Sequence, residues 1–166
     1  YDAENLYFAA EVTDDFIKNP QTGFWIWAND SIQLAVDTQN DAIGPEFTKS
    51  TGYDDNDYEY GIALGRSGPE VFCYTTAAVN SEIRKKNVPF KMAIKKVSNN
   101  KLVYEIAIPQ KYLLPLKIAN GNAFGMSFVI HDRDEKDKYT RYRMQLTPGI
   151  VSGKKPDAFK TFMFTE

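Results

Sequence analysis

Apolar and polar residues alternate with a period of two over many short stretches of this 166-residue chain. This period is typical of β-strands, in which successive side chains point to opposite faces of a sheet. Asn99-Asn100 separates two such stretches and predicts a hairpin turn, because Asn adopts positive φ at low cost. The predicted strands cover residues 6–12, 32–36, 58–64, 71–74, 90–94, 102–108, 126–130, 142–146 and 159–164.

Helical periodicity is weak along the whole chain. Residues 110–114 predict at most a short helical turn, which Pro115 would end. Many short strands with turns between them favour an all-β fold over a parallel α/β sheet. We therefore expect a two-sheet antiparallel β-sandwich of the jelly-roll kind, and a single domain over residues 1–166, since no repeat or low-complexity linker divides the chain.

Composition excludes several classes of partner. The net charge is −2 and charged residues make up 25% of the chain, so no positive field is expected to attract nucleic acid or an anionic membrane surface. No apolar run approaches the roughly 18 residues of a spanning helix, which argues against membrane insertion. Cys73 is the single cysteine and cannot form an internal disulfide. Stability is expected to come from the core, with a bound metal ion as a further source.

The segment Phe24-Trp25-Ile26-Trp27-Ala28-Asn29-Asp30 is the strongest candidate for ligand contact. A flat indole stacks on the C–H-rich face of a pyranose ring, and neighbouring polar groups bind its hydroxyls. Trp25 and Trp27 have the same parity and would point the same way in an extended chain. The alternative is that both rings cap the core. We take Trp27 as the first candidate and Trp25 as its neighbour.

Acidic residues cluster after predicted strands at Asp14-Asp15, at residues 54–57 and at residues 132–137. Ca²⁺ takes six to eight oxygen ligands, which clustered carboxylates on loops can supply. Solvated turns rich in Asp are the alternative, and none of the clusters has EF-hand spacing. Asp14 and Asp132 each directly follow a strand, so we expect them to meet at one edge of the sandwich and bind a structural Ca²⁺.

Catalytic signatures are missing from the sequence. His131 is the single histidine, which excludes a multi-histidine zinc site, and no G-x-S-x-G or glycine-rich phosphate loop is present. Many carboxylates are available for glycosidase chemistry, but no spacing selects a pair. We therefore expect a protein that binds its ligand and is not itself an enzyme.

Six segments occur in an order typical of a known family: residues 2–15, 27–37, 104–109, 124–132, 147–150 and 155–159. They resemble family 9 carbohydrate-binding modules and related sugar-binding-like (DOMON-like) β-sandwich domains. The resemblance implies a two-sheet antiparallel sandwich, often stabilised by calcium, within larger secreted proteins that act on polysaccharides. The first strand usual in the group is missing before residue 2, so we expect a module excised from a longer chain.

By position, the resemblance places Trp27 on one of two tryptophans that sandwich a sugar, and Gln33 on a side chain that hydrogen-bonds it. Four positions depart from the pattern. Ser152-Gly153 stands where the second tryptophan is expected, and Gly61 and Ala63 replace a basic and an amide residue. The family pattern also has a polar residue on the strand before His131, and Val129 stands at that position here.

The expected function is a non-catalytic module that binds a polysaccharide or oligosaccharide and targets an attached glycoside hydrolase or lyase, outside the cell or at its surface. Trp27, Trp25, Gln33 and Tyr53 are the expected sugar-binding residues. The alternative is a structural module that has lost sugar binding and docks on a neighbouring catalytic domain. Related sandwiches also include haem-binding domains, for which His131 with Met126 or Met144 would be the ligands.

Overall fold

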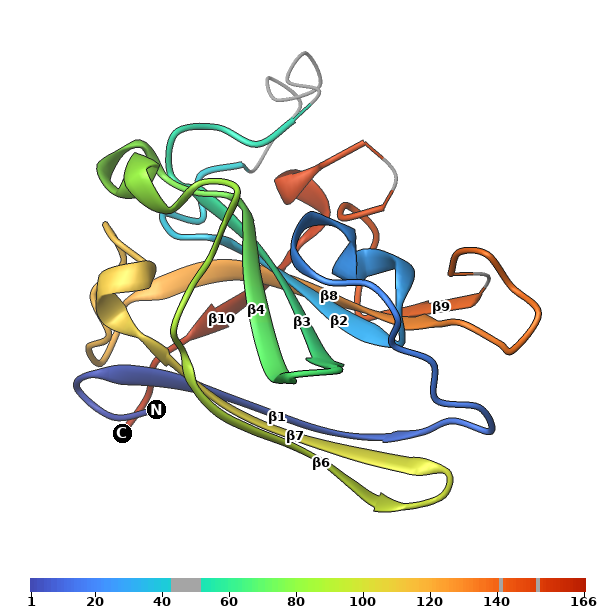
Figure 1. Ribbon diagram of the computed structural model, residues 1–166. Coiled ribbons are helices and arrows are strands. Elements are labelled where there is room, and N and C mark those ends of the chain that lie inside the picture. The colour runs from blue at the N-terminus through green and yellow to red at the C-terminus, as the bar shows by residue number, and fades with distance from the viewer. Residues whose placement is uncertain (43–51, 141, 152) are drawn as a thin grey trace.

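Two antiparallel sheets of unequal size form the protein, as the computed structural model shows for residues 1–42, 52–140, 142–151 and 153–166 (Figure 1). The small sheet has the strand order β1-β7-β6, and the large sheet has the order β10-β8-β2-β3-β4-β5, with β9 also paired to β8. The small-sheet strands are β1 (Asn5–Thr13), β6 (Lys91–Ser98) and β7 (Lys101–Pro109). The large-sheet strands are β2 (Ser31–Asp37), β3 (Asp57–Gly65), β4 (Gly68–Thr75), β5 (Lys86–Asn87), β8 (Ala123–Asp132), β9 (Tyr142–Gln145) and β10 (Lys160–Met163).

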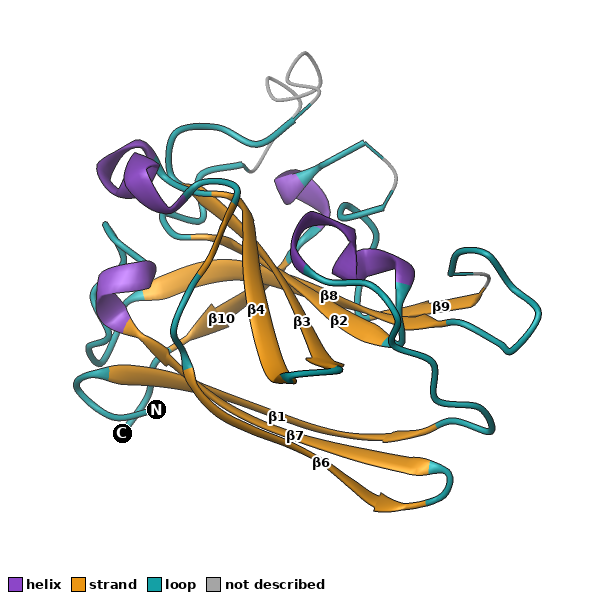
Figure 2. Ribbon diagram, in the orientation of Figure 1, coloured by secondary structure: helices purple, strands orange, loops and turns teal. Residues whose placement is uncertain are grey.

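The predicted β-sandwich is confirmed, and each predicted strand has its counterpart in the structure. Alternation fails to find β5, because two residues are too short to show a period. Short 3₁₀ helices also occur outside the predicted turn at residues 110–114, contrary to our expectation of at most one. They are η1 (Gly23–Ala28), η3 (Ala78–Ile83), η4 (Gln110–Tyr112) and η5 (Pro156–Ala158) (Figure 2).

The main core lies between the two sheets and is built by alternate residues of the long strands. The large sheet contributes the residues of even number on β2 and β3, and the small sheet those of even number on β7. These side chains are Ile32, Leu34, Val36, Tyr58, Tyr60, Ile62, Leu102, Tyr104, Ile106 and Ile108. Alternation in the sequence thus correctly identified the apolar face of β2, β3 and β7.

The outer face of the large sheet is covered as well, which alternation did not predict. All seven residues of β2 are buried, including those that point away from the small sheet. Two small apolar clusters explain this burial: Ile26 of η1 packs on Ala63 and Phe72, and Ile150 packs on Ala35 and Val129. The segments that carry Ile26 and Ile150 lie on the side of the large sheet away from the small one (Figure 1).

No helix among the described residues has the length and apolar character needed to cross a membrane.

Candidate functional site

A cavity of about 410 Å³ opens on the outer face of the large sheet, between the two small apolar clusters. The η1 helix forms one wall, and the segment after Gly149 forms another. Strands β2, β3, β4, β8 and β9 contribute the remaining surface. The lining residues are Phe24, Trp27, Gln33, Glu59, Tyr74, Thr75, His131, Arg143, Ile150, Val151 and Lys154.

Trp27 lines this cavity from η1, and hydrogen bonds hold its backbone on both sides. Its N–H donates to the Tyr74 hydroxyl at 3.2 Å, and the Thr140 hydroxyl donates to its carbonyl oxygen at 2.7 Å. Trp25 and Trp27 both belong to the 3₁₀ helix, so their equal parity does not decide which way the rings point, as it would in an extended chain. These two bonds hold the main chain of Trp27, from which the indole projects toward the cavity.

Two further aromatic rings support Trp27 from outside the cavity lining. The Trp25 ring lies 5.8 Å from the Trp27 ring, centroid to centroid, at 41°, and the Tyr139 ring lies 6.0 Å away in a nearly parallel arrangement at 17°. Offset aromatic pairs of this kind are favourable beyond the area that they bury. Trp25 is 50% exposed and does not line the cavity, so the structure places it beside the candidate site and not within it.

The floor of the cavity is a chain of polar side chains from β2, β3 and β8. The Gln33 amide donates to a Glu59 carboxylate oxygen at 2.8 Å, and its own oxygen accepts from Nε2 of His131 at 2.5 Å. All three side chains are buried. Because each is on the outward-facing set of its strand, the sheet register brings them together from positions up to 98 residues apart.

Lys154 is the last member of this hydrogen-bonded row of side chains and binds Glu59. Its ammonium donates to both Glu59 carboxylate oxygens, at 2.7 and 2.5 Å, so the two charges cancel inside the cavity. Burial, together with the positive charges of Arg143 and Lys154, lowers the pKa of His131 to about 3. His131 is therefore a neutral imidazole at physiological pH, and it holds the orientation of the Gln33 amide.

Gly61 explains one of the departures from the family pattern. It is on β3 directly across from Gln33, and a Cβ at this position would lie 2.7 Å from Cε2 of Tyr74. The Tyr74 ring occupies the space where another side chain would stand. It forms part of the cavity wall, and its hydroxyl accepts the hydrogen bond from Trp27.

Of the four predicted sugar-binding residues, Trp27 and Gln33 line the cavity and Trp25 and Tyr53 do not. Tyr53 packs against Phe159, with ring centroids 6.3 Å apart, and Nζ of Lys154 lies 5.6 Å from its ring centroid. The Tyr53 ring therefore contacts Lys154, which lines the cavity, but does not line the cavity itself. The predicted long loop of residues 44–57 falls partly on residues 43–51, and the missing second tryptophan partly on Ser152, both outside the described residues.

Glu59, Tyr74, Arg143 and Lys154 were not predicted as site residues. Glu59 carried a recognisable signal, since it is a carboxylate inside an otherwise apolar strand. Lys154 carried none, because its partner Glu59 is 95 residues away and only the folded chain brings them together.

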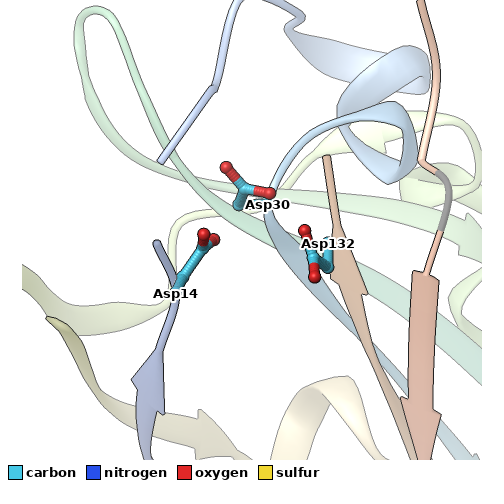
Figure 3. Close-up of side chains that lie close together, drawn as sticks. All are labelled: Asp14, Asp30 and Asp132. Atoms are coloured by element: carbon cyan, nitrogen blue, oxygen red, sulfur yellow. The ribbon is translucent and has the colours of Figure 1, made fainter. Parts of the chain in front are cut away.

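A second site of interest is formed by three carboxylates at the edge of the sandwich (Figure 3). Asp14 follows β1 and Asp132 ends β8, as the sequence predicted, and Asp30 precedes β2. Their ligand oxygens lie within 4.8 Å of one another. Within the described ranges, no other set of three acidic, histidine or cysteine residues meets this criterion. Asp30 was not predicted, because it precedes a strand whereas the predicted ligands follow strands.

The chemistry of this group fits a hard divalent cation. One carboxylate oxygen of Asp132 is buried without a hydrogen-bond partner among the described residues, a costly state unless an ion or water satisfies it. Burial raises the pKa of Asp30 to about 7, with the charges of Asp14 and Asp132 adding to the effect. The nearby Arg133 guanidinium donates instead to the carbonyl oxygens of Ala28 and Asp137. Three converging carboxylates therefore lack a neutralising side chain among these contacts.

The haem alternative is excluded by strand geometry. Met144 pairs with Ile130 across β8 and β9, whereas His131 pairs with Arg143. Neighbouring residues of a strand point to opposite faces, so Met144 lies on the face away from His131. Met126, five residues before His131 on β8, also faces the core. Neither methionine can share an iron with His131.

Comparisons with known proteins agree with this geometry. The family model described as "Carbohydrate family 9 binding domain-like" matches residues 1–147. A comparison with curated proteins gave no match. Among solved structures, a family 9 carbohydrate-binding module from Caldicellulosiruptor kristjanssonii in complex with cellotriose superposes with a TM-score of 0.70 at 17% identity, over 99% of this chain and 71% of that one.

Two further solved structures share the fold. The Caldicellulosiruptor kristjanssonii module in complex with glucose superposes with a TM-score of 0.69 at 17% identity, covering 98% of this chain and 72% of that one. A putative carbohydrate-binding protein from Bacteroides uniformis superposes with a TM-score of 0.54 at 14% identity, covering 98% and 74%. At these identities the likeness shows a common sandwich.

Proposed function

Because the chain belongs to the carbohydrate family 9 binding-domain-like family, we propose that it is a non-catalytic module that binds a saccharide in the cavity beside Trp27. The observation that carries the proposal is that Trp27 and Gln33, the two residues placed by the family resemblance, line one cavity. Its volume of about 410 Å³ is within the roughly 300–1,000 Å³ typical of small-molecule sites. Solved family members with bound glucose and cellotriose support a saccharide as the ligand.

The site chemistry suits a sugar in two ways. The Trp27 indole offers an apolar face for the C–H groups of a pyranose. The floor offers an amide, a carboxylate and an ammonium, which are the donors and acceptors that hydroxyl groups need. Because the floor groups already hydrogen-bond one another, they are held in place before binding and lose little conformational freedom on it.

We expect Trp27→Ala to weaken binding of cello-oligosaccharides by about 10- to 100-fold, since one stacking residue contributes roughly 1–3 kcal/mol. The measurement is isothermal titration with cellotriose. The matched control is Trp25→Ala, which removes an exposed indole outside the lining and should cost less than about threefold. Equal affinity of the Trp27 variant and the unmodified protein would overturn the placement of the sugar.

The same titration separates this function from the alternative of a docking module. A module that has lost sugar binding gives no heat and no change in tryptophan fluorescence with any saccharide. We further propose that the module works outside the cell and targets an attached glycoside hydrolase or lyase to its glycan. Retention of the full parent protein on an insoluble polysaccharide, lost with Trp27→Ala, tests this targeting role.

We also propose that Asp14, Asp30 and Asp132 hold a structural Ca²⁺. Bound there, the ion would supply positive charge that links the end of β1 to the ends of β2 and β8. Two of the three side chains also bind backbone donors at this edge: Arg133 N–H donates to Asp30 at 2.6 Å, and Phe16 N–H donates to Asp14 at 2.8 Å.

Millimolar Ca²⁺ is expected to raise the melting temperature by about 5–10 °C over the protein in chelator. An ion that binds only the folded state at about 100 times its Kd contributes roughly 2.7 kcal/mol. Asp132→Asn should abolish the rise, while Asp157→Asn, which removes an exposed carboxylate elsewhere, should leave it intact. A rise of equal size in the Asp132 variant would contradict the site.

A further inference from the structure

The charges that line the cavity do not balance. Glu59 and Lys154 neutralise each other in an ion pair at 2.5 Å, and Nε2 of His131 is hydrogen-bonded to Gln33. The remaining ionised group is the Arg143 guanidinium. This side chain is exposed and makes no hydrogen bond or ion pair with any residue of the described ranges. Among the described lining residues, Arg143 is therefore a positive charge without an ion-pair partner, although the chain as a whole carries a net charge of −2.

The position of Arg143 directs this charge to the ligand. Arg143 is on β9 directly opposite His131 on β8, and opposite residues of an antiparallel pair share a face with Cβ atoms roughly 5 Å apart. His131 in turn contacts Gln33 in the floor. The guanidinium thus lies beside the floor on which a sugar stacked against Trp27 would rest.

We propose that the module selects glycans that contain hexuronic acid, with the sugar carboxylate bound by Arg143. This inference rests on the proposed sugar-binding function and names its substrate class. A guanidinium presents a planar fork of N–H donors that matches the two oxygens of a carboxylate, and an ionised pair of this kind is stronger than a bond to a neutral hydroxyl. Glu59 already neutralises the charge of Lys154, whereas the charge of Arg143 has no such partner among the described residues, which assigns this role to Arg143.

The other charged side chains considered among the described residues either lie outside the cavity lining or are already paired. Lys138 lies with its ammonium 5.4 Å from the ring centroid of Tyr139, outside the cavity lining. The acidic group of Asp14, Asp30 and Asp132 belongs to the edge of the sandwich, and none of its members lines the cavity. The nearest lining carboxylate, Glu59, is held by Lys154 and Gln33.

The test uses a matched pair of ligands: a glucuronic-acid-bearing oligosaccharide and the same oligosaccharide after reduction of its carboxyl group to an alcohol. Isothermal titration of the folded module should give an affinity for the acidic ligand about tenfold higher than for the reduced one. Arg143→Gln should remove this preference by lowering the affinity for the acidic ligand about tenfold more than the affinity for the reduced one. Lys95→Gln, which removes an exposed cation on the small sheet, is the charge-matched control and should keep the preference.

Failure of the inference and failure of the proposed function give different results. Equal affinity for both ligands, or an equal loss for both in the Arg143 variant, overturns the selection of hexuronic acid while sugar binding stands. A preference for a sulfated oligosaccharide over the carboxylate also overturns it, since a tetrahedral anion would then be the ligand. Absence of binding to every saccharide, with no difference between Trp27→Ala and the unmodified protein, overturns the proposed function itself.

Discussion

Gly61→Ala is expected to lower the free energy of unfolding by about 2–3 kcal/mol and to weaken sugar binding at the same time. The added Cβ would lie 2.7 Å from Cε2 of Tyr74, 2.8 Å from its hydroxyl oxygen and 3.0 Å from Cγ1 of Ile26. Tyr74 must move, and its hydroxyl then loses the hydrogen bond from the Trp27 backbone. Because Ile26 and Trp27 belong to the same short helix, both changes displace the indole that forms the cavity wall.

Thermal unfolding and titration with cellotriose measure the two effects. Gly65→Ala is the matched control on the same strand, because a Cβ there meets its nearest atoms at 3.4 and 3.5 Å, ordinary contact distances. The control should change the melting temperature by no more than about 2 °C, against a fall of roughly 5–10 °C for Gly61→Ala. If Gly61→Ala had the same melting temperature as the unmodified protein, the Tyr74 ring would not fill the space that the structure assigns to it.

The strands of this fold could be predicted because apolar and polar residues alternate within each core strand, independently of its neighbours in the sheet. Ile32, Leu34 and Val36 reveal the inner face of β2 without any knowledge of their neighbours. The burial of the outer face could not be predicted in the same way. It depends on Ile26 and Ile150, which lie in segments without a regular period and reach the sheet only in the folded chain.

In the candidate site, too, residues in local motifs could be predicted, and pairs formed only on folding could not. Trp27 and Gln33 were found through local motifs with a family resemblance, and both line the cavity. The Glu59–Lys154 pair joins residues 95 positions apart, so no local pattern contains it. Tyr53 shows the opposite error: an aromatic residue in an acidic loop suggested ligand contact, but its ring packs on Phe159 beneath Lys154.

The acidic edge site was predictable in outline. Asp14 and Asp132 were expected to meet because each follows a strand, and their oxygens do lie close together. Asp30 occupies the third corner because β2 starts where β8 ends in the antiparallel register, with Ser31 opposite His131. That register is a property of the sheet and is not visible in any one segment.

Gly149→Ala is expected to have the largest effect on stability, a loss of about 3–4 kcal/mol. The residue has φ of +116°, a conformation that only glycine adopts at low cost, and a Cβ would lie 2.3 Å from the carbonyl oxygen of Lys155. The Lys155 N–H also donates to the Gly149 carbonyl at 2.7 Å, so this contact closes the loop that carries Ile150, Val151 and Lys154. Opening the loop would separate Lys154 from Glu59 and remove one wall of the cavity.

Thermal unfolding of Gly149→Ala should therefore show a fall in melting temperature of roughly 6–16 °C, with sugar binding lost together with the loop. Gly121→Ala separates strain from collision, because Gly121 also has positive φ, at +83°, but a Cβ there meets nothing within 4 Å. We expect that control to lose only about 1 kcal/mol and to keep its affinity for cellotriose. Equal losses of unfolding free energy in the two variants would mean that backbone strain alone accounts for both. The collision with Lys155 at Gly149 would then contribute nothing.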